Sequence, residues 1–167
     1  PILNERAGTG NPFFSVLLSI SNHPPYVIPP YFHPHSDVLE EQIVEYADWS
    51  IRQFMQAAEK QPWFDNTIFV FLGDHGKMVG TPECEMPQSY NHIPLMIYGK
   101  DIKPGVYDGF GGQVDVSPTL LGLLNISYLQ NNFGVNLLEE ERPCMFFTAD
   151  NLIGARDSVN MFIYSPD

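Results

Sequence analysis

Apolar runs that alternate with polar and proline-rich segments predict the secondary structure of this chain. Residues 13–20 (FFSVLLSI) and 67–72 (TIFVFL) are short and almost continuously apolar, which is typical of buried strands. Between them, residues 37–60 carry apolar side chains at helical spacing, and Asp37 with Glu40 resembles a capping box. The order strand, helix, strand predicts a βαβ unit with parallel strands and a right-handed crossover.

The second half of the chain continues this alternation. Residues 92–98 (HIPLMIY) predict a third short buried strand, and residues 145–148 and 161–164 predict two more, in a terminal hairpin or at a sheet edge. Residues 113–124 predict a helix with Ser117 as its N-cap and a proline at its first position. The predicted fold is therefore α/β, with a mostly parallel sheet flanked by helices.

The predicted strand 67–72 ends abruptly in Gly73, Asp74, His75 and Gly76. Ligands bind at the carboxyl ends of strands in open α/β sheets, and a carboxylate beside an imidazole offers oxygen and nitrogen ligands to a divalent metal. Gly-Asp is also common turn material, so this segment alone leaves a metal site and a polar turn equally open.

Other candidate residues lie near predicted strand ends. His23 follows the first predicted strand and His92 begins the third, so both could converge with Asp74 and His75 on one metal and anion site. The alternatives are a histidine that caps a turn before two prolines and a loop histidine bonded to the backbone. His33 and His35, in a proline-rich loop, are predicted to be solvated. Asp115 could be a ligand, but an acid in the first turn of a helix also favours the helix dipole.

The composition and charge of the chain exclude some classes of function. The 167 residues are 44% hydrophobic and carry a formal net charge of −12, which argues against nucleic acid as a partner. An acidic protein that handles an anionic substrate needs a local cation, and a metal ion can supply it. Cys84 and Cys144 are too few for a disulfide framework, although they could pair. No G-x-S-x-G elbow, P-loop or C-x-x-C motif supplies a nucleophile.

Five motifs in order carry a family resemblance that spans residues 11–126. The chain resembles the C-terminal part of the sulfatase-like branch of the alkaline phosphatase superfamily. It is most similar to lipoteichoic acid synthase-type phosphoglycerol transferases, and next to phosphoethanolamine transferases. The motifs are SISNHPPY at 19–26, YADWSIRQFM at 46–55, DNTIFVFLGDHG at 65–76, NHIPLMIYG at 91–99 and QVDVSPTLLGLL at 113–124.

The resemblance implies a role for each candidate residue. Asp74 and His75 match the family's metal pair, which holds manganese or zinc; calcium and magnesium are further options. His23 matches the histidine that faces the substrate phosphate, and His92 resembles a histidine of phosphoethanolamine transferases. The family's threonine nucleophile and a glutamate ligand lie N-terminal of the segment that contains His23, upstream of Pro1. The resemblance therefore implies that the chain holds part of an active site.

The resemblance also implies what the parent protein does. Residues 1–167 are then the C-terminal portion of a single sulfatase-like catalytic domain, whose parent transfers or hydrolyses a phosphoester with a lipid-linked phosphoglycerol- or phosphoethanolamine-type head group. One alternative is a sulfate ester hydrolase of the same fold, and another is a non-catalytic fragment that lacks the nucleophile. We expect the parent to be anchored in a membrane upstream of this chain, with its catalytic domain outside the cytoplasm.

Overall fold

The computed structural model describes residues 1–78, 80–82, 84–149 and 151–166. The chain divides into two compact units. The first comprises Pro1–Phe69 and Tyr98–Asp101, and the second comprises Val70–Ile97 and Ile102–Asp167.

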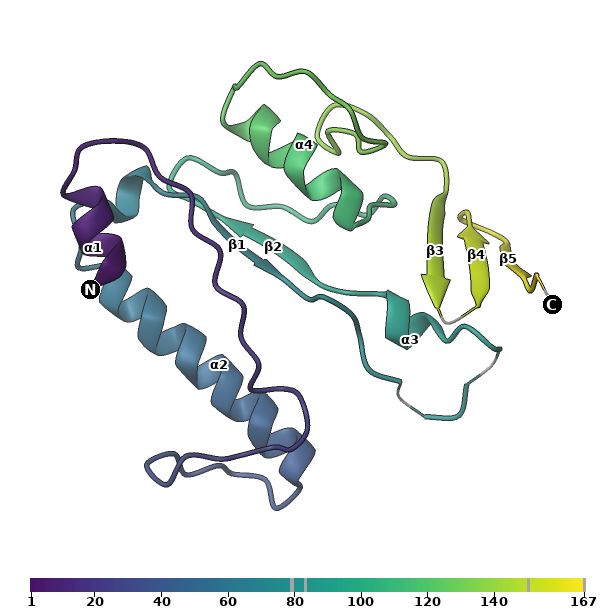
Figure 1. Cartoon of the computed structure of the whole chain (residues 1–167), viewed down its shortest axis with the longest axis horizontal. Helices are drawn as coiled ribbons and strands as arrows, with labels where there is room; N and C mark the ends of the chain where they lie inside the picture. The colour runs from purple at the N-terminus through teal and green to yellow at the C-terminus, as the bar shows by residue number, and fades with distance from the viewer. Residues whose placement is uncertain (79, 83, 150, 167) are drawn as a thin grey trace. The chain divides into compact units, whose positions relative to one another are not determined.

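The first unit is built around one long helix. It contains α1 (Ile2–Ala7), α2 (Leu39–Ala58) and the short 3-10 helix η1 (Phe64–Asn66), as Figure 1 shows. Apolar residues at helical spacing give α2 a face to bury, and Ile43 and Ala58 are 0% and 3% exposed. The predicted helix at 37–60 is thus confirmed, with two residues fewer at each end.

Aromatic side chains pack along both ends of α2. Near its N-terminal half, Tyr46 contacts Phe32 at 5.3 Å and Trp49 at 6.1 Å between ring centroids. Near its C-terminal end, Phe69 lies 5.3–6.3 Å from a second set of rings. The members of this second set are Phe54, Trp63, Phe64 and Tyr98. These edge-on, tilted and stacked ring contacts contribute to the apolar packing of the first unit.

The N-terminus of α2 is capped differently from the prediction. The capping box of Asp37 and Glu40 is wrong, because the N-cap is Val38 and makes no side-chain cap. Instead, the Ser36 hydroxyl accepts a hydrogen bond from Val38 N at 3.0 Å. From the second turn of the helix, the Glu45 carboxylate accepts the backbone amides of His35 and Ser36. The hydrogen bond from the His35 amide has the largest effect, and together the two amide donors outweigh partial burial and lower the pKa of Glu45.

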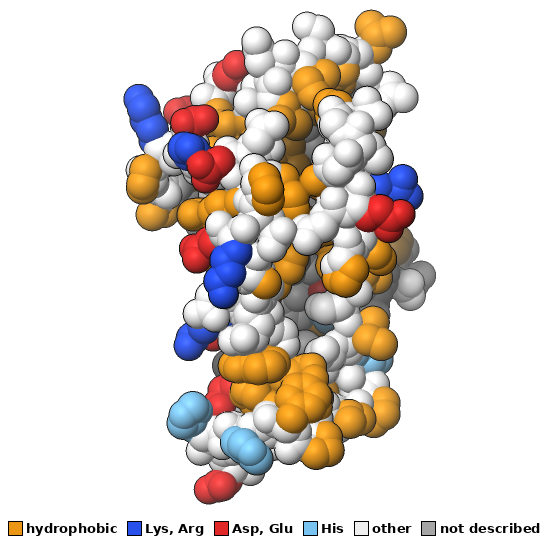
Figure 2. Space-filling view, turned by 90° about the vertical axis from the view of Figure 1, so that its left-hand side faces the viewer, with side chains coloured by type: hydrophobic (Ala, Val, Ile, Leu, Met, Phe, Trp, Pro, Cys, Tyr) orange, Lys and Arg blue, Asp and Glu red, His pale blue; other side chains and the backbone are white. Residues whose placement is uncertain are grey.

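The predicted strand at residues 13–20 is wrong. The segment takes part in neither sheet, and its apolar side chains lie open to solvent, with Phe14 85%, Leu18 83% and Ile20 79% exposed. Figure 2 shows several groups of apolar side chains at the surface on the face that it presents. A strand requires a neighbour to hydrogen-bond its backbone, and none of the described segments supplies one here. Without that strand, the predicted βαβ unit does not form.

The strand predicted at 67–72 is present as β1 (Phe69–Leu72), and the strand predicted at 92–98 as β2 (Leu95–Tyr98). The two strands pair with each other in a two-stranded sheet. They run in opposite directions in Figure 1, and beyond their ends Gly73 N donates to Pro94 O at 3.3 Å. The prediction of a mostly parallel sheet is therefore not confirmed. Burial of β1 on both faces is also wrong, because Leu72 is 43% exposed.

The second unit contains the other helices and a small sheet. The chain between β1 and β2 forms the single-turn helix α3 (Gln88–Asn91), and α4 (Gln113–Leu123) follows β2. The helix predicted at 113–124 is confirmed, but the N-cap at Ser117 is wrong because Gly112 takes that place. Asn125, with φ of 52°, follows the last turn in the left-handed conformation common after helix ends.

Three antiparallel strands complete the second unit. They are β3 (Met145–Ala149), β4 (Leu152–Arg156) and β5 (Met161–Tyr164), in the order β3-β4-β5. Strands were predicted at the positions of β3 and β5, whereas β4 was missed. None of the helices in the described residues has the length and apolar character needed to cross a membrane. The thiols of Cys84 and Cys144 are free, so they do not pair.

Candidate functional site

The turn that follows β1 carries the two predicted metal ligands. Gly73 leaves the strand, and Asp74 and His75 come next, with side chains 78% and 55% exposed. The Asp74 carboxylate uses Oδ1 to accept the backbone N–H of His75 at 2.9 Å. That bond occupies Oδ1 and leaves Oδ2 available on the other side of the carboxylate group.

The protonation of the His75 ring follows from its hydrogen bond. Nδ1 lies 2.7 Å from Gly76 O, which can only accept, so the proton is on Nδ1. In the neutral ring, Nε2 then presents a lone pair, and it lies 3.9 Å from Asp74 Oδ2. A backbone carbonyl on the other ring nitrogen is a usual partner of metal-binding histidines. Two free ligand atoms of different chemistry therefore share one exposed position.

The Asp74–His75 pair fits part of a divalent metal site. Two ligands about 2.0–2.1 Å from a tetrahedral ion lie roughly 3.3 Å apart, a little closer than Nε2 and Oδ2 lie here. Rotation of either exposed side chain can make up this difference. No group of three or more His, Cys, Asp or Glu side chains that could hold a metal forms within the part of the chain that the structure describes. The pair thus fills about half of a four-ligand site.

The helix α3 supports the turn from one side. Gly76 N donates to Tyr90 O at 2.8 Å, and the ring of Tyr90 stacks on that of His75 with centroids 5.2 Å apart and planes at 23°. A Cβ atom at Gly76 would lie 2.0 Å from Ser89 O. Glycine is therefore required at residue 76 for the turn and α3 to approach this closely.

The helix α4 supports the turn from its other end. Gln113, the first residue of α4, donates from Nε2 to Asp74 O at 2.7 Å and to Gly73 O at 3.2 Å. One amide group thereby bridges the two carbonyls immediately before His75.

The structure places the other predicted site residues individually. His23 is exposed in the first unit, and its Nδ1 lies 2.8 Å from Pro24 O, so Nδ1 carries the proton and Nε2 is free. His92 is exposed in the second unit just before β2, and its backbone N–H donates to Gln88 O at 2.7 Å. The roles assigned to His23 and His92 remain predictions. His33 and His35 are exposed as predicted, although His35 also contacts Glu45.

Asp115 has a structural role in the second unit. Its carboxylate is 0% exposed and accepts Gly112 N at 2.9 Å, Val135 N at 2.9 Å and Arg142 Nε at 2.9 Å, with a second bond from Arg142 Nη2. Burial acts to raise the pKa of Asp115, but the hydrogen bonds from Arg142 and the two amides outweigh it and lower the pKa. Of the two alternatives for Asp115, the structure favours the helix-terminus acid, because its oxygens are occupied by these donors.

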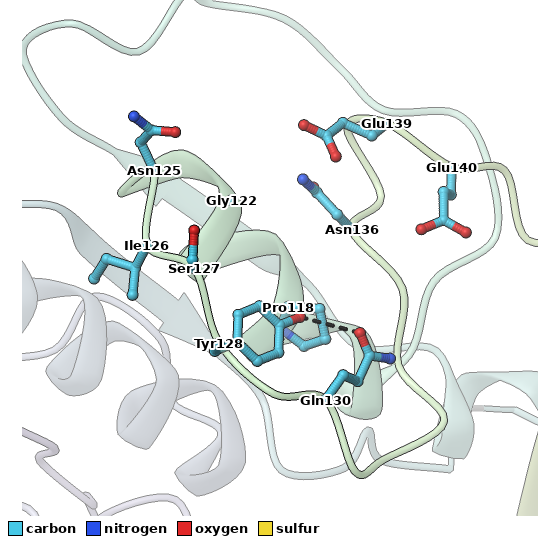
Figure 3. A pocket seen from close by; sticks show the side chains of 10 residues that line it. All are labelled: Pro118, Gly122, Asn125, Ile126, Ser127, Tyr128, Gln130, Asn136, Glu139 and Glu140. Carbon is cyan, nitrogen blue, oxygen red and sulfur yellow. Dashed lines mark hydrogen bonds between the residues drawn. The ribbon is translucent and has the colours of Figure 1, made fainter.

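A separate hollow of about 340 Å³ lies at the C-terminal end of α4. Figure 3 shows its lining, in which the Tyr128 hydroxyl donates to Gln130 Oε1 at 3.2 Å. Its other lining residues include Pro118, Asn125, Asn136, Glu139 and Glu140. None of the predicted metal or catalytic residues lines it, so the hollow is distinct from the Asp74–His75 pair.

The family model named Sulfatase matches residues 2–126, which is most of the chain. The chain belongs to the sulfatase family. The matched range includes His23, Asp74, His75, His92 and Gln113.

The relatives of this chain within the family include a lipoteichoic acid synthase and a choline-sulfatase. It is 26% identical over 185 residues to lipoteichoic acid synthase 1 of Bacillus subtilis (strain 168), which covers 92% of this chain and 28% of that protein. It is 29% identical over 121 residues to choline-sulfatase of Rhizobium meliloti (strain 1021), which covers 64% of this chain and 22% of that protein.

A solved structure shows the fold. A protein in the alkaline phosphatase superfamily from Vibrio parahaemolyticus matches with a TM-score of 0.85 and 28% identity over 97% of this chain and 41% of that chain. The resemblance to the sulfatase-like branch and to lipoteichoic acid synthases is thus confirmed. The chain spans less than a third of the length of the two curated relatives.

Two residues that support the Asp74–His75 pair were given no role from the sequence. Tyr90 directly precedes the motif NHIPLMIYG and Gln113 begins the motif QVDVSPTLLGLL, but neither was identified as a ligand or a catalytic group. Their role depends on contacts between segments far apart in the chain, which hydrophobic periodicity does not report.

Proposed function

We propose that the parent of this chain transfers or hydrolyses a phosphoester in a metal-dependent reaction, with Asp74 and His75 as two of the metal ligands. The observation that carries the proposal is the pairing of a free His75 Nε2 with a free Asp74 Oδ2, 3.9 Å apart, just beyond β1. Manganese and zinc suit this oxygen and nitrogen donor set, and calcium or magnesium would need more oxygen ligands.

The chain's own residues then perform limited tasks. A divalent cation, when bound, supplies positive charge next to the oxygens of the ester group that reacts. Asp74 and His75 hold that charge at one position, in a chain whose net charge is −12 and would otherwise repel an anionic substrate. His23 presents Nε2 to the phosphate, where it can donate a hydrogen bond or a proton once the ring is charged. His92 is a second candidate for the same task.

The substrate proposal follows from the relatives. The match to a lipoteichoic acid synthase over 92% of the chain supports a lipid-linked phosphoglycerol- or phosphoethanolamine-type head group as substrate. We propose accordingly that the parent is anchored in a membrane and acts outside the cytoplasm. The nucleophile and the remaining metal ligands are then supplied by parts of the parent beyond the described residues.

A sulfate ester hydrolase is the second candidate function. The observation that favours it is the 29% identity to choline-sulfatase, although this match covers 64% of the chain against 92% for the synthase. Phosphate and sulfate esters are both tetrahedral anionic groups, so the Asp74–His75 pair itself does not distinguish them. A non-catalytic role in binding or assembly is the third candidate.

The decisive experiment combines metal content with turnover in the full-length protein. Asp74→Asn removes one ligand charge while it keeps the size of the side chain. We expect the variant to lose bound manganese or zinc and all metal-dependent turnover of phosphoglycerol head groups. Asp108→Asn, at an exposed aspartate of the second unit, is the matched control and should keep both. Unchanged metal content and activity in Asp74→Asn would sink the assignment.

Two further measurements separate the alternatives. Turnover of phosphoglycerol lipids and of aryl sulfates, with and without Mn²⁺, distinguishes the phosphoester from the sulfate ester function. His23→Ala should lower turnover while metal content stays near that of the wild-type protein, because His23 is proposed to face the substrate. Loss of the metal in that variant would instead make His23 a ligand. Absence of turnover on both substrates would favour the non-catalytic role.

A further inference from the structure

The turn that bears Asp74 and His75 is held at two points by segments far away in the sequence. On the His75 side, α3 contributes the stacked ring and the backbone carbonyl of Tyr90. On the Asp74 side, the Gln113 side chain of α4 donates to Asp74 O at 2.7 Å and to Gly73 O at 3.2 Å. The two contacts act on neighbouring peptide groups from different elements.

We propose that Gln113 is a positioning residue, which orients the backbone of Gly73 and Asp74 so that Asp74 and His75 present their free atoms to the same cation. The proposal rests on the metal-dependent function proposed above. The Asp74 and His75 side chains are 78% and 55% exposed. Each is hydrogen-bonded to the turn's own backbone, Asp74 Oδ1 to His75 N and His75 Nδ1 to Gly76 O. The position of that backbone therefore affects where the free atoms of both side chains lie.

The geometry of the Gln113 amide suits this task. A carboxamide NH₂ group has two protons, and here both face carbonyl oxygens of consecutive residues. One bond goes to the peptide group between Gly73 and Asp74, and the other goes to the peptide group between Asp74 and His75. Together they restrict rotation of the two peptide groups on either side of Asp74. The carbonyls of both residues point towards α4 as a result, and the Asp74 side chain is left free to face Nε2 of His75.

The base on which Gln113 stands is itself rigid. Two residues further along α4, the buried Asp115 carboxylate accepts Gly112 N and Val135 N and is held by Arg142. The first turn of α4 is therefore tied to two other segments of the second unit. Gln113 lies in this first turn, so its backbone position is fixed and its side-chain amide can form hydrogen bonds with Gly73 and Asp74 in a defined geometry.

The test replaces the amide without disturbing the helix. Gln113→Met keeps the length of the side chain and a good helix former but removes both N–H donors, and Gln113→Ala removes the side chain altogether. The matched control is Gln61→Met in the first unit, where Gln61 Nε2 donates to one backbone carbonyl, Ala57 O, at 3.3 Å. Both sets of variants are made in the full-length protein.

The first readout is amide hydrogen exchange in the metal-free protein. In Gln113→Met and Gln113→Ala, we expect the amides of His75 and Gly76 to exchange about tenfold faster or more. The amides of α4 beyond its first turn should keep their wild-type rates, because Asp115 still anchors them. Faster exchange over all of α4 would show that Gln113 merely stabilises the helix, and that result would overturn the proposal.

The second readout is the affinity for Mn²⁺, measured by titration with electron paramagnetic resonance of the free ion. Loss of a residue that orients metal ligands typically costs 10- to 100-fold in affinity, and we expect this range for both Gln113 variants. Gln61→Met should bind as the wild type does. Wild-type affinity in Gln113→Met would overturn the proposal even if the turn exchanges faster.

The two proposals fail in different ways. If Asp74→Asn loses Mn²⁺ while Gln113→Met keeps it, the metal-dependent function stands and the role of Gln113 is wrong. If the wild-type protein does not bind Mn²⁺ or Zn²⁺, the metal-dependent function is wrong and the positioning role falls with it, whatever the exchange rates of the turn are.

Discussion

Replacement of Arg142 by methionine would leave a carboxylate buried without its ion partner. In the folded protein Asp115 is 0% exposed, and the Arg142 side chain is 16% exposed. The guanidinium donates twice to the carboxylate and also donates from Nη2 to Phe133 O at 2.8 Å. In Arg142→Met, the carboxylate keeps the two backbone amides of Gly112 and Val135 but loses the opposite charge.

The expected cost at pH 7 is about 3–4 kcal/mol. Removal of one partner from a buried ion pair typically costs about 3–5 kcal/mol. The cost of the unpaired charge has an upper limit, because the carboxylate can take up a proton instead of staying charged. Protonating an aspartate of ordinary pKa near 3.9 at pH 7 costs about 1.36 kcal/mol for each of roughly three pH units. At pH 5 the same limit falls to about 1.5 kcal/mol. The penalty should therefore shrink as the pH falls from 7 to 5.

Urea unfolding followed by far-ultraviolet circular dichroism measures this cost, and hydrogen exchange of α4 assigns it to the second unit. Trp49 and Trp63, the two tryptophans of the chain, lie in the first unit, so their fluorescence reports on that unit alone. The matched control is Arg52→Met. Arg52 contacts Asp48 at 3.4 Å with both side chains more than 60% exposed, and loss of such a surface pair costs less than about 0.5 kcal/mol.

Equal costs for Arg142→Met and Arg52→Met would refute this reasoning, as would a penalty at pH 5 as large as that at pH 7. A double variant provides a second check. In Asp115→Asn with Arg142→Met, the buried charge is absent, so the double variant should be more stable at pH 7 than Arg142→Met alone.

Two further predictions concern the turn and acid stability. Gly76→Ala places a Cβ atom 2.0 Å from Ser89 O, so α3 or the turn must shift, and we expect the protein to lose about 1–3 kcal/mol of stability and to bind Mn²⁺ more weakly. Gly105→Ala is the control, because no heavy atom lies within 4 Å of the added Cβ, and equal effects of the two substitutions would contradict this prediction. The pKa of Asp115 is lower in the folded than in the unfolded protein. The stability that Asp115 contributes is therefore complete above about pH 4 and is lost as the pH falls through the lower pKa of the folded state. Hydrogen exchange of α4, measured as a function of pH, should show this loss in the wild type, and the same loss in Asp115→Asn would argue against Asp115 as its source.

Local patterns in the sequence predicted several elements correctly. The helical spacing of apolar residues located α2 and α4, and short apolar runs located β1, β2, β3 and β5. The same reasoning placed Asp74 and His75 directly after β1, where the structure has them. Such features depend on residues a few positions apart, whose conformations and side-chain directions are set by local sterics and periodicity.

Pairing between segments did not follow from those patterns. Residues 13–20 read as a buried strand, but the described structure leaves them exposed and outside both sheets. β1 pairs with β2 in opposite directions, although the predicted sheet was mostly parallel. An apolar run indicates that a segment can be buried. The strand with which it pairs, and the direction of that pairing, depend on which other segments lie beside it in the folded protein.

The Asp74–His75 pair shows the same division between sequence and structure. The neighbouring positions of Asp74 and His75 left a metal site and a polar turn equally open, and the ordered motifs of the family resemblance led to their prediction as ligands. The hydrogen bond between His75 Nδ1 and Gly76 O, the stacked ring of Tyr90 and the bridging amide of Gln113 were found only in the tertiary structure. Which residue can bind a metal is a property of its side chain. How the exposed side chains of Asp74 and His75 are placed relative to each other depends on contacts between α3, α4 and the turn, and these contacts exist only when the chain is folded.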